Sequence, residues 1–323
     1  MTLYIEPRSF LIEASMRWKR GQRLKLVSES DAPSPARAVL REVRESLGIP
    51  VVPVLYQAYA AFPEFLERHW QAFGPAVQSR QFFLLGSRLG AESYTRAHNY
   101  FEIRALPRPE AATTQACTLQ IAQVLDYYQY LDPVLLLIAA AQMQAFERPV
   151  GQPMRHAELA GHPQFSAAPS LLDDERASPV LQRSWNERKR LFELALVSDE
   201  HRALACFPDF YLPYWATLKE LLQSPVYADC QYRLAESALE MANELPARVE
   251  TEVSQLLEAG VTDEQITSIM RINEAFMQAL TAQVLDITFA RIGCEGGTPT
   301  EHAPHKPPLV ETSDKTGSPV RAA

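Results

Sequence analysis

Apolar residues recur along most of this chain at the spacing of one face of an α-helix. In residues 36–47 the apolar positions are Val39, Leu40, Val43 and Leu47, and residues 118–129 show a comparable pattern. Spacings of three and four residues place side chains on one helical face. Strict alternation of apolar and polar residues, which is typical of half-buried strands, is almost absent. The pattern therefore predicts an all-α protein.

Local start signals place several of the expected helices. Proline is favoured in the first helical turn, so Pro63 and Pro208 are expected to begin helices, and Asp132-Pro133 is expected to cap and begin another. Thr262, followed three residues later by Gln265, forms a capping-box pattern. We therefore expect a helix over residues 263–292.

One stretch of the chain occurs twice. Residues 58–70 and 203–215 are identical at six of thirteen positions when they are offset by 145 residues. The identical pairs are Ala58/Ala203, Ala60/Ala205, Phe62/Phe207, Pro63/Pro208, Phe65/Phe210 and Trp70/Trp215. A second block at the same offset aligns Gln120-Ile121 with Gln265-Ile266. Two separate blocks at one spacing indicate duplication of a whole unit. We predict a pseudo-dimer of two duplicated helical repeats joined by a long linker.

The composition of the chain suggests where these units begin and end. Residues 148–178 are rich in proline and glycine, which favours a linker, and the last residues are rich in Gly, Pro, Thr and Ser, which favours disorder. The predicted units are an N-terminal lead-in (1–35), helical repeat 1 (36–147), the linker (148–179), helical repeat 2 (180–292) and a disordered tail (293–323).

Charge and residue usage exclude several classes of function. The formal net charge is −8 and no dense basic run occurs, so we expect no nucleic-acid partner. The longest apolar segment, residues 134–141, is far shorter than the ~20 residues of a membrane span. The four cysteines form no C-x-x-C pair, and the histidines show no helix-face metal pair. With no visible secretory signal, we expect a cytoplasmic protein without a metal site.

The two predicted repeats differ at positions that carry carboxylates. Asp199 aligns with Val54, and Asp132 aligns with Met277. If both acids lie between the halves, they form one composite polar site, in which two close carboxyl groups raise one of the pKa values. The alternative is structural, because Ser198-Asp199-Glu200 and Asp132-Pro133 are also ordinary helix starts. Both interpretations remain open at this stage.

Four motifs, in order, resemble those of a known family. They are Ile49-Pro50-Val51-Val52, Leu131-Asp132-Pro133-Val134-Leu135-Leu136-Leu137-Ile138, Arg148-Pro149-Val150-Gly151, and Ser198-Asp199 followed by Ala203-Leu204-Ala205-Cys206-Phe207-Pro208. The set is similar to the group I 2-haloacid dehalogenases, also called halocarboxylic acid dehydrogenases. That family is all-α and consists of two repeats, as predicted here.

The resemblance implies a hydrolase that acts on short 2-haloalkanoic acids. In the family an aspartate activates a water molecule, which attacks the halogen-bearing carbon directly, with inversion and with no metal, cofactor or covalent intermediate. The base falls on Asp199, and the residue that helps to hold the water, an asparagine in the family, falls on Asp132. Ser198 would help to fix the substrate carboxylate, and Val197 stands at the position that influences the choice of enantiomer.

Apolar walls are expected around this site. Family aromatics fall on Val51 and Val54, where this chain has aliphatic residues, and Phe276 and Met277 are further candidates for the walls. All four also fit an ordinary core. A protonated Asp132 would offer a hydrogen-bond donor and an acceptor, much as asparagine does.

A second function belongs to another class. The pattern A-x-A-x-F-P-x-F-x-x-x-x-W is also similar to the helical repeat of alkylhydroperoxidase-like proteins, but the cysteine pair that their chemistry requires is missing. The alternative is therefore a non-catalytic helical scaffold that binds a small acid or a protein partner. For the first hypothesis the partner is a halogenated carboxylic acid. The sequence leaves a homodimer open.

Overall fold

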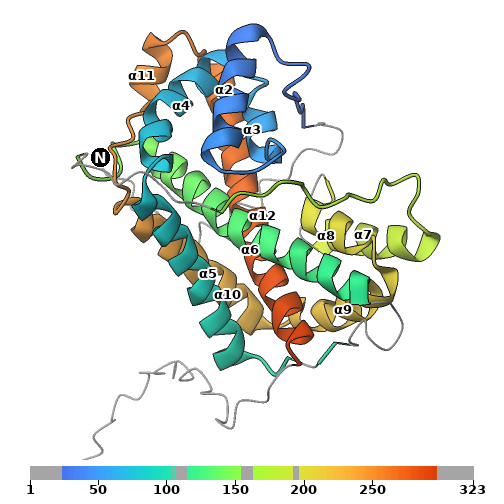
Figure 1. Cartoon of the computed structure of the whole chain (residues 1–323). Helices are drawn as coiled ribbons and strands as arrows, with labels where there is room; N and C mark the ends of the chain where they lie inside the picture. Colours follow the sequence, from blue (N-terminus) through green and yellow to red (C-terminus); the bar gives the residue numbers. More distant parts are fainter. Residues whose placement is uncertain (1–23, 104, 107–114, 154–162, 192–195, 297–323) are drawn as a thin grey trace, which may run out of the picture.

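The computed structural model describes residues 24–103, 105–106, 115–153, 163–191 and 196–296, and this part of the chain is a bundle of α-helices (Figure 1). Within these ranges the only β-type pairing is an isolated antiparallel bridge between Val150 and Val249. The all-α prediction is confirmed. None of the helices in these ranges combines the length and the hydropathy that a bilayer crossing requires.

The helices follow one another through short turns. Their bounds are α2 Ser34–Ser46, α3 Val54–Tyr59, α4 Pro63–Val77, α5 Arg80–Tyr100, α6 Gln115–Ala145, α7 Pro179–Leu191, α8 Asp199–Leu204, α9 Pro208–Leu222, α10 Pro225–Ala242, α11 Val253–Glu258 and α12 Asp263–Cys294. Pro63 and Pro208 begin α4 and α9, and Thr262 and Gln265 form the capping box of α12, as predicted.

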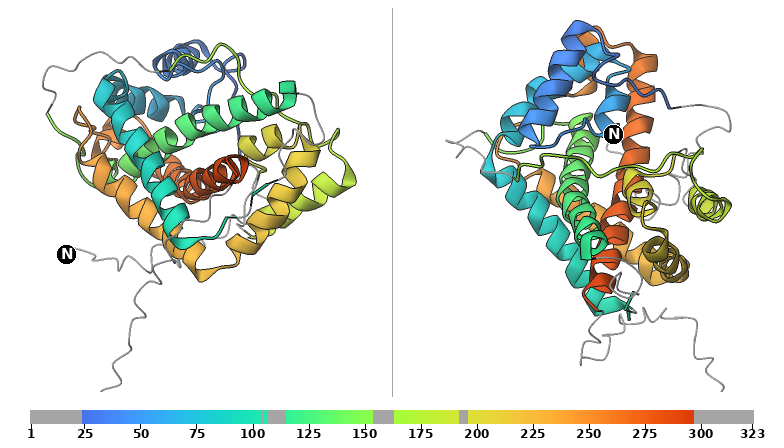
Figure 2. Two further views of the ribbon diagram at one scale, coloured as in Figure 1. Left: turned by 60° about the horizontal axis from the view of Figure 1, so that its bottom comes forward. Right: turned by 45° about the vertical axis from the view of Figure 1, so that its right-hand side comes forward.

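Two long helices, α6 and α12, form the centre of the bundle. They pack against each other, and α5 and α10 pack along them (Figure 1). Helices α2 to α4 lie beside one end of this pair and α7 to α9 beside the other, and other helices surround α12 in the left view of Figure 2. Residues 134–141 of α6 are buried. Their apolar run, too short for a membrane, is therefore the core of the protein.

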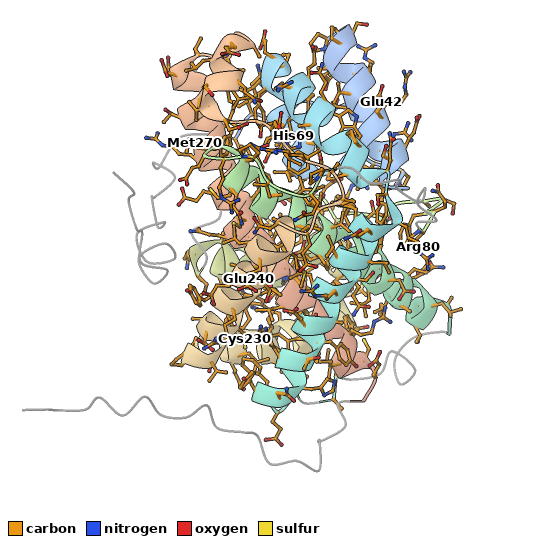
Figure 3. The ribbon with its side chains drawn as sticks, turned by 90° about the vertical axis from the view of Figure 1, so that its left-hand side faces the viewer. Glu42, His69, Arg80, Cys230, Glu240 and Met270 are labelled. Carbon is orange, nitrogen blue, oxygen red and sulfur yellow. The ribbon has the colours of Figure 1, made fainter. Side chains whose placement is uncertain are left out.

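The helix bounds repeat at one spacing. Helices α2, α3, α4 and α5 begin 145 residues before α7, α8, α9 and α10. A hydrogen bond repeats as well: Trp70 Nε1 donates to Glu42 Oε2 at 3.0 Å, and Trp215 Nε1 donates to Glu187 Oε2 at 3.3 Å. Figure 3 labels Glu42 on α2. These correspondences support the inferred duplication.

The expected helix start at Asp132-Pro133 is wrong, because α6 runs through both residues without a break. Proline has no N–H to donate to the carbonyl four residues earlier, and in a helix interior this costs about 3 kcal/mol or more. Here the core offsets that cost, since the residues on both sides of Pro133 are buried. Asp132 is therefore an interior helical residue and does not cap a helix.

Other boundaries differ from the expectation by less. We predicted a helix from residue 187, but α7 begins at Pro179, where Ser178 Oγ accepts a hydrogen bond from the backbone N–H of Leu181. Helix α12 continues to Cys294, into the predicted tail. Residues 1–23 of the lead-in and 297–323 of the tail lie outside the described residues. The division into lead-in, repeats and linker stays a prediction.

Candidate functional site

Asp199 is the first residue of α8, and Ser198 precedes it as the N-cap. About a third of the Asp199 side chain is exposed (34%), and its Oδ1 lies 4.0 Å from Arg202 Nη1. Partial burial raises the pKa of the Asp199 carboxyl group above its ordinary value, and Arg202 opposes this shift. Asp199 is thus a carboxylate at the edge of the core that a small molecule can reach.

Asp132 lies on α6, which packs against α8, and its exposed fraction is only 3%. Burial raises the pKa of Asp132 well above its ordinary value, and the negative charges of Glu200 and Asp199 raise it further. Asp132 Oδ2 has no hydrogen-bond partner among the described residues. Buried polar atoms are normally paired, so this oxygen indicates a place for a water molecule or a ligand. The fold brings Asp132 and Asp199 into one electrostatic neighbourhood.

Two tyrosines of α6 adjoin the same acids. Burial raises the pKa of Tyr127, and the charges of Asp132 and Asp199 add to this effect. Burial also raises the pKa of Tyr128, with further contributions from Asp199 and Glu200. Both phenols therefore keep their protons, and they form a neutral, partly aromatic surface beside the two carboxyl groups.

Ser198 does not cap α8 with its side chain. Its hydroxyl group instead donates a hydrogen bond to Glu200 Oε1 at 2.5 Å. The neighbouring Val197 is partly buried against the core. Both residues adjoin Asp199 in the chain, so the geometry is compatible with the predicted roles in substrate binding.

The four predicted wall residues lie in different environments. Val51 is half exposed (51%), and Val54 is the first, half-buried residue of α3. Phe276 is half-buried on α12, and Met277 beside it is buried. Because α12 packs against α3, Val54 and Phe276 belong to neighbouring elements. Their role as walls stays a prediction, and Val51 fits a rim better than an enclosed wall.

A buried charged cluster beside Asp199 was not predicted. Arg188 Nη2 donates to Asp286 Oδ2 at 2.7 Å and lies 3.6 Å from Glu200 Oε1. Tyr227 Oη donates to Asp286 Oδ1 at 2.8 Å, and His201 Nε2 lies 3.3 Å from Asp286 Oδ2. Helices α7, α8, α10 and α12 each contribute to the cluster.

The electrostatics of this cluster follow from its burial. Burial raises the pKa of Glu200 to about 7, although Arg188 and the Ser198 hydroxyl oppose the shift. Burial lowers the pKa of His201 to about 4, so the imidazole is neutral at neutral pH. The 145-residue comparison that singled out Asp199 and Asp132 would also have found these residues, if it had been applied to every charged position.

The described residues contain no group of three or more His, Cys, Asp or Glu side chains that is arranged to hold a metal ion. Cys117, Cys206, Cys230 and Cys294 are free thiols. The expectation that the chemistry needs neither a metal nor a cofactor stays a prediction. What the site offers is a set of carboxyl groups, one of them accessible and one buried with an unpaired oxygen.

Comparison with known proteins was made by sequence first. The family model described as "Halocarboxylic acid dehydrogenase DehI" matches residues 50–201. An (R)-2-haloacid dehalogenase of Pseudomonas putida is 22% identical over 270 residues, which cover 81% of this chain and 90% of that protein. An (R)-2-haloacid dehalogenase of Rhizobium sp. (strain NHG3) is 21% identical over 234 residues, which cover 69% and 88%.

Solved structures with the same fold include those of a D-2-haloacid dehalogenase. Its complex with L-LA superposes with a TM-score of 0.78 at 21% identity, and it covers 85% of this chain and 97% of its own. A mutant in complex with D-2-CPA gives the same values. At this level of identity the comparison establishes the fold.

Proposed function

Because this chain belongs to the family of the halocarboxylic acid dehydrogenases, the group I 2-haloacid dehalogenases, we propose that it hydrolyses short 2-haloalkanoic acids. The observation that carries this proposal is the pairing of Asp199 with Asp132. A reachable carboxylate stands near a buried carboxyl group whose Oδ2 has no partner among the described residues. Such a pair fits the activation of one water molecule beside a small substrate.

The proposed reaction is one in-line displacement. The water oxygen attacks carbon 2 of the substrate, the carbon–halogen bond breaks, and the halide leaves with the bonding electron pair. Asp199 accepts a proton from the attacking water and later releases it to solvent. The product is the 2-hydroxy acid with inverted configuration. A halide needs no acid to leave, so a positioned base is the main chemical requirement, and it contributes roughly 10²- to 10⁴-fold.

Asp132 would hold the water for Asp199. Its buried carboxyl group stays protonated at neutral pH, because burial and the charges of Glu200 and Asp199 raise its pKa. A protonated carboxyl group donates one hydrogen bond and accepts others. It can therefore fix a water molecule in the way that an amide would, without adding a negative charge that repels an anionic substrate.

The remaining contacts would select the substrate. Ser198 would bind the carboxylate of the acid, and Val197, Val54, Phe276 and Met277 would surround its short chain, with Val51 at the rim. The relatives that are (R)-2-haloacid dehalogenases support the (R) enantiomer as the better substrate. The predicted walls are small and apolar, which suits a chain of two or three carbons better than a long one.

The first prediction concerns Asp199. The purified protein should release halide from (R)-2-chloropropionate, and Asp199→Ala should lower kcat by about 10²- to 10⁴-fold because the base is lost. The matched control is Asp209→Ala, which removes an exposed acid from the first turn of α9 and should leave kcat unchanged. Halide release with each enantiomer is the measurement.

A single turnover in ¹⁸O-labelled water tests the direct attack. With enzyme in excess, direct attack places the label in the first hydroxy acid that forms, whereas a covalent ester would place an unlabelled carboxylate oxygen there. If the wild-type protein releases no halide from any short 2-haloacid, the dehalogenase proposal is wrong. The non-catalytic scaffold that binds a small acid or a protein would then remain.

A further inference from the structure

The charged cluster behind Asp199 is more elaborate than a stable fold requires. Arg188, Glu200 and Asp286 are each almost completely buried. The positions 145 residues earlier are Val43, Leu55 and Ala141, on the corresponding helices α2, α3 and α6, and all three are buried apolar residues.

Apolar packing thus serves at the corresponding places of the first half. Burying charges is costly, and apolar residues of similar volume commonly stabilise a core as well or better. The charges in the second half therefore indicate a functional requirement, and they lie on the elements that carry Asp199.

Glu200 connects this cluster to the site. Its Oε1 accepts the hydrogen bond from Ser198 Oγ at 2.5 Å and lies 3.6 Å from Arg188 Nη2. While Glu200 is ionised, the only hydroxyl proton of Ser198 is used in this bond, and Ser198 can offer an incoming carboxylate nothing but lone pairs. Once Glu200 carries a proton, the bond can reverse, and the Ser198 hydroxyl is then free to donate to another acceptor.

We propose that Glu200 is a positioning residue: a proton on its carboxyl group turns the Ser198 hydroxyl away from Glu200 and toward the carboxylate of an anionic substrate. This inference rests on the proposed function, since it concerns how the same site takes up its acid. The proton comes from solvent, and no covalent bond is made or broken. Binding of the acid is thereby coupled to uptake of one proton.

The groups that face Glu200 leave it as a suitable switch. Arg188 of α7 keeps its charge at all ordinary pH values, and Asp286 of α12 accepts hydrogen bonds from Arg188 and Tyr227 and adjoins His201. The neighbouring tyrosines, Tyr128 of α6 and Tyr211 and Tyr214 of α9, stay protonated because burial raises each pKa.

Asp132 of α6 and Asp199 of α8 are the other acids nearby, and Asp132 interacts with Glu200 strongly enough for the two to titrate together. Since burial raises the pKa of Glu200 to about 7, its protonation changes within the working range of the enzyme. The experiment must therefore separate the titration of Glu200 from that of Asp132.

The test measures binding and turnover across pH. Propionate, which has the carboxylate but no leaving group, is titrated by calorimetry between about pH 6 and about pH 9, and KM for (R)-2-chloropropionate is measured alongside. If the protonated form binds, the wild-type affinity should fall above the Glu200 pKa, approaching about tenfold per pH unit. In Glu200→Gln the amide donates to Ser198 Oγ at every pH, so the fall should disappear and the affinity should stay high.

Two further variants make the result specific. Ser198→Ala should bind weakly at every pH, at the level of the wild type in alkali, because the donor is gone. Asp132→Asn should keep the pH dependence, because Glu200 is still present. The matched control is Glu240→Gln, which makes the same carboxyl-to-amide change on the exposed face of α10, where Figure 3 labels this residue, and it should behave as the wild type.

The outcomes also separate this inference from the proposed function. An alkaline fall in affinity that persists in Glu200→Gln overturns the role of Glu200, even if halide is released normally. The same holds if wild-type affinity does not change with pH or if propionate does not bind. If propionate binds with the predicted dependence but no 2-haloacid is dehalogenated, the proposed reaction is wrong and the switch in acid binding stands.

Discussion

At the scale of single residues, two buried aspartates have opposite surroundings. Asp286 accepts hydrogen bonds from Arg188 and Tyr227 and adjoins His201. Asp132 has an oxygen without a partner in the described part of the chain, and negative neighbours surround it. The first arrangement requires a carboxylate, whereas the second favours a neutral group. The chemistry of the site depends on this difference.

The change Asp132→Asn should preserve or raise kcat for 2-haloacid hydrolysis. An amide offers the donor and acceptor of a protonated carboxyl group and cannot ionise, so activity at alkaline pH should benefit most. Steady-state halide release across pH is the measurement. The contrasting variant is Asp286→Asn, which leaves Arg188 without its buried counterion and should destabilise the protein by about 3–5 kcal/mol. An inactive but folded Asp132→Asn protein would rule out the neutral role of Asp132.

At the scale of elements, close packing between α5 and α6 places Asp132. Gly86 of α5 faces Val134, two residues beyond Asp132, and a Cβ added there would lie 2.8 Å from Val134 Cγ2. One turn further along α5, a Cβ on Gly90 would meet Pro133 Cγ at an ordinary 3.5 Å. The absence of a side chain at Gly86 thus allows the proline-containing part of α6 to lie against α5.

Gly86→Ala should therefore destabilise the protein by about 1–3 kcal/mol, because β-branched Val134 has little room to move. Gly90→Ala should be neutral or stabilise the protein by up to about 1 kcal/mol, because alanine favours the helix and meets no close contact. Urea unfolding of both variants is the measurement. Equal midpoints for the two variants would show that α5 and α6 are not in tight contact at Gly86.

At the scale of the whole molecule, the chain that leaves α6 is held against the segment before α11. The backbone N–H of Val150 donates to the carbonyl of Val249 at 3.0 Å, and the reverse bond is 2.7 Å. Gly151 follows with φ +89°, and a Cβ there would lie 2.3 Å from the carbonyl oxygen of Ala247. The chain can leave the first predicted repeat along this path only with a glycine at position 151.

Gly151→Ala should destabilise the protein strongly, and Gly260→Ala provides the matched control. Gly260 has φ +90° but nothing within 4 Å of an added Cβ, so its replacement should cost only the backbone strain of about 1–3 kcal/mol. Gly151→Ala should cost about 1–3 kcal/mol more from the backbone clash. Thermal and urea unfolding measure both. A smaller effect at Gly151 than at Gly260 would contradict this packing.

The sequence by itself determined the helical class and the bounds of several helices. Periodicity, Pro63, Pro208 and the Thr262–Gln265 box act within a few residues, so they can be recognised without the fold. The 145-residue comparison also singled out Asp199 and Asp132, because an acid opposite an apolar residue is visible in one dimension.

Only the tertiary structure decided what surrounds those acids. The continuity of α6 through Pro133 depends on burial by other helices, which outweighs the local signal for a helix start. The bond between Arg188 and Asp286 joins residues 98 apart, and the pKa of Glu200 depends on burial by several helices. Local patterns specify helices because their hydrogen bonds are local. The properties of a buried charge depend on distant segments, and these meet only when the chain has folded.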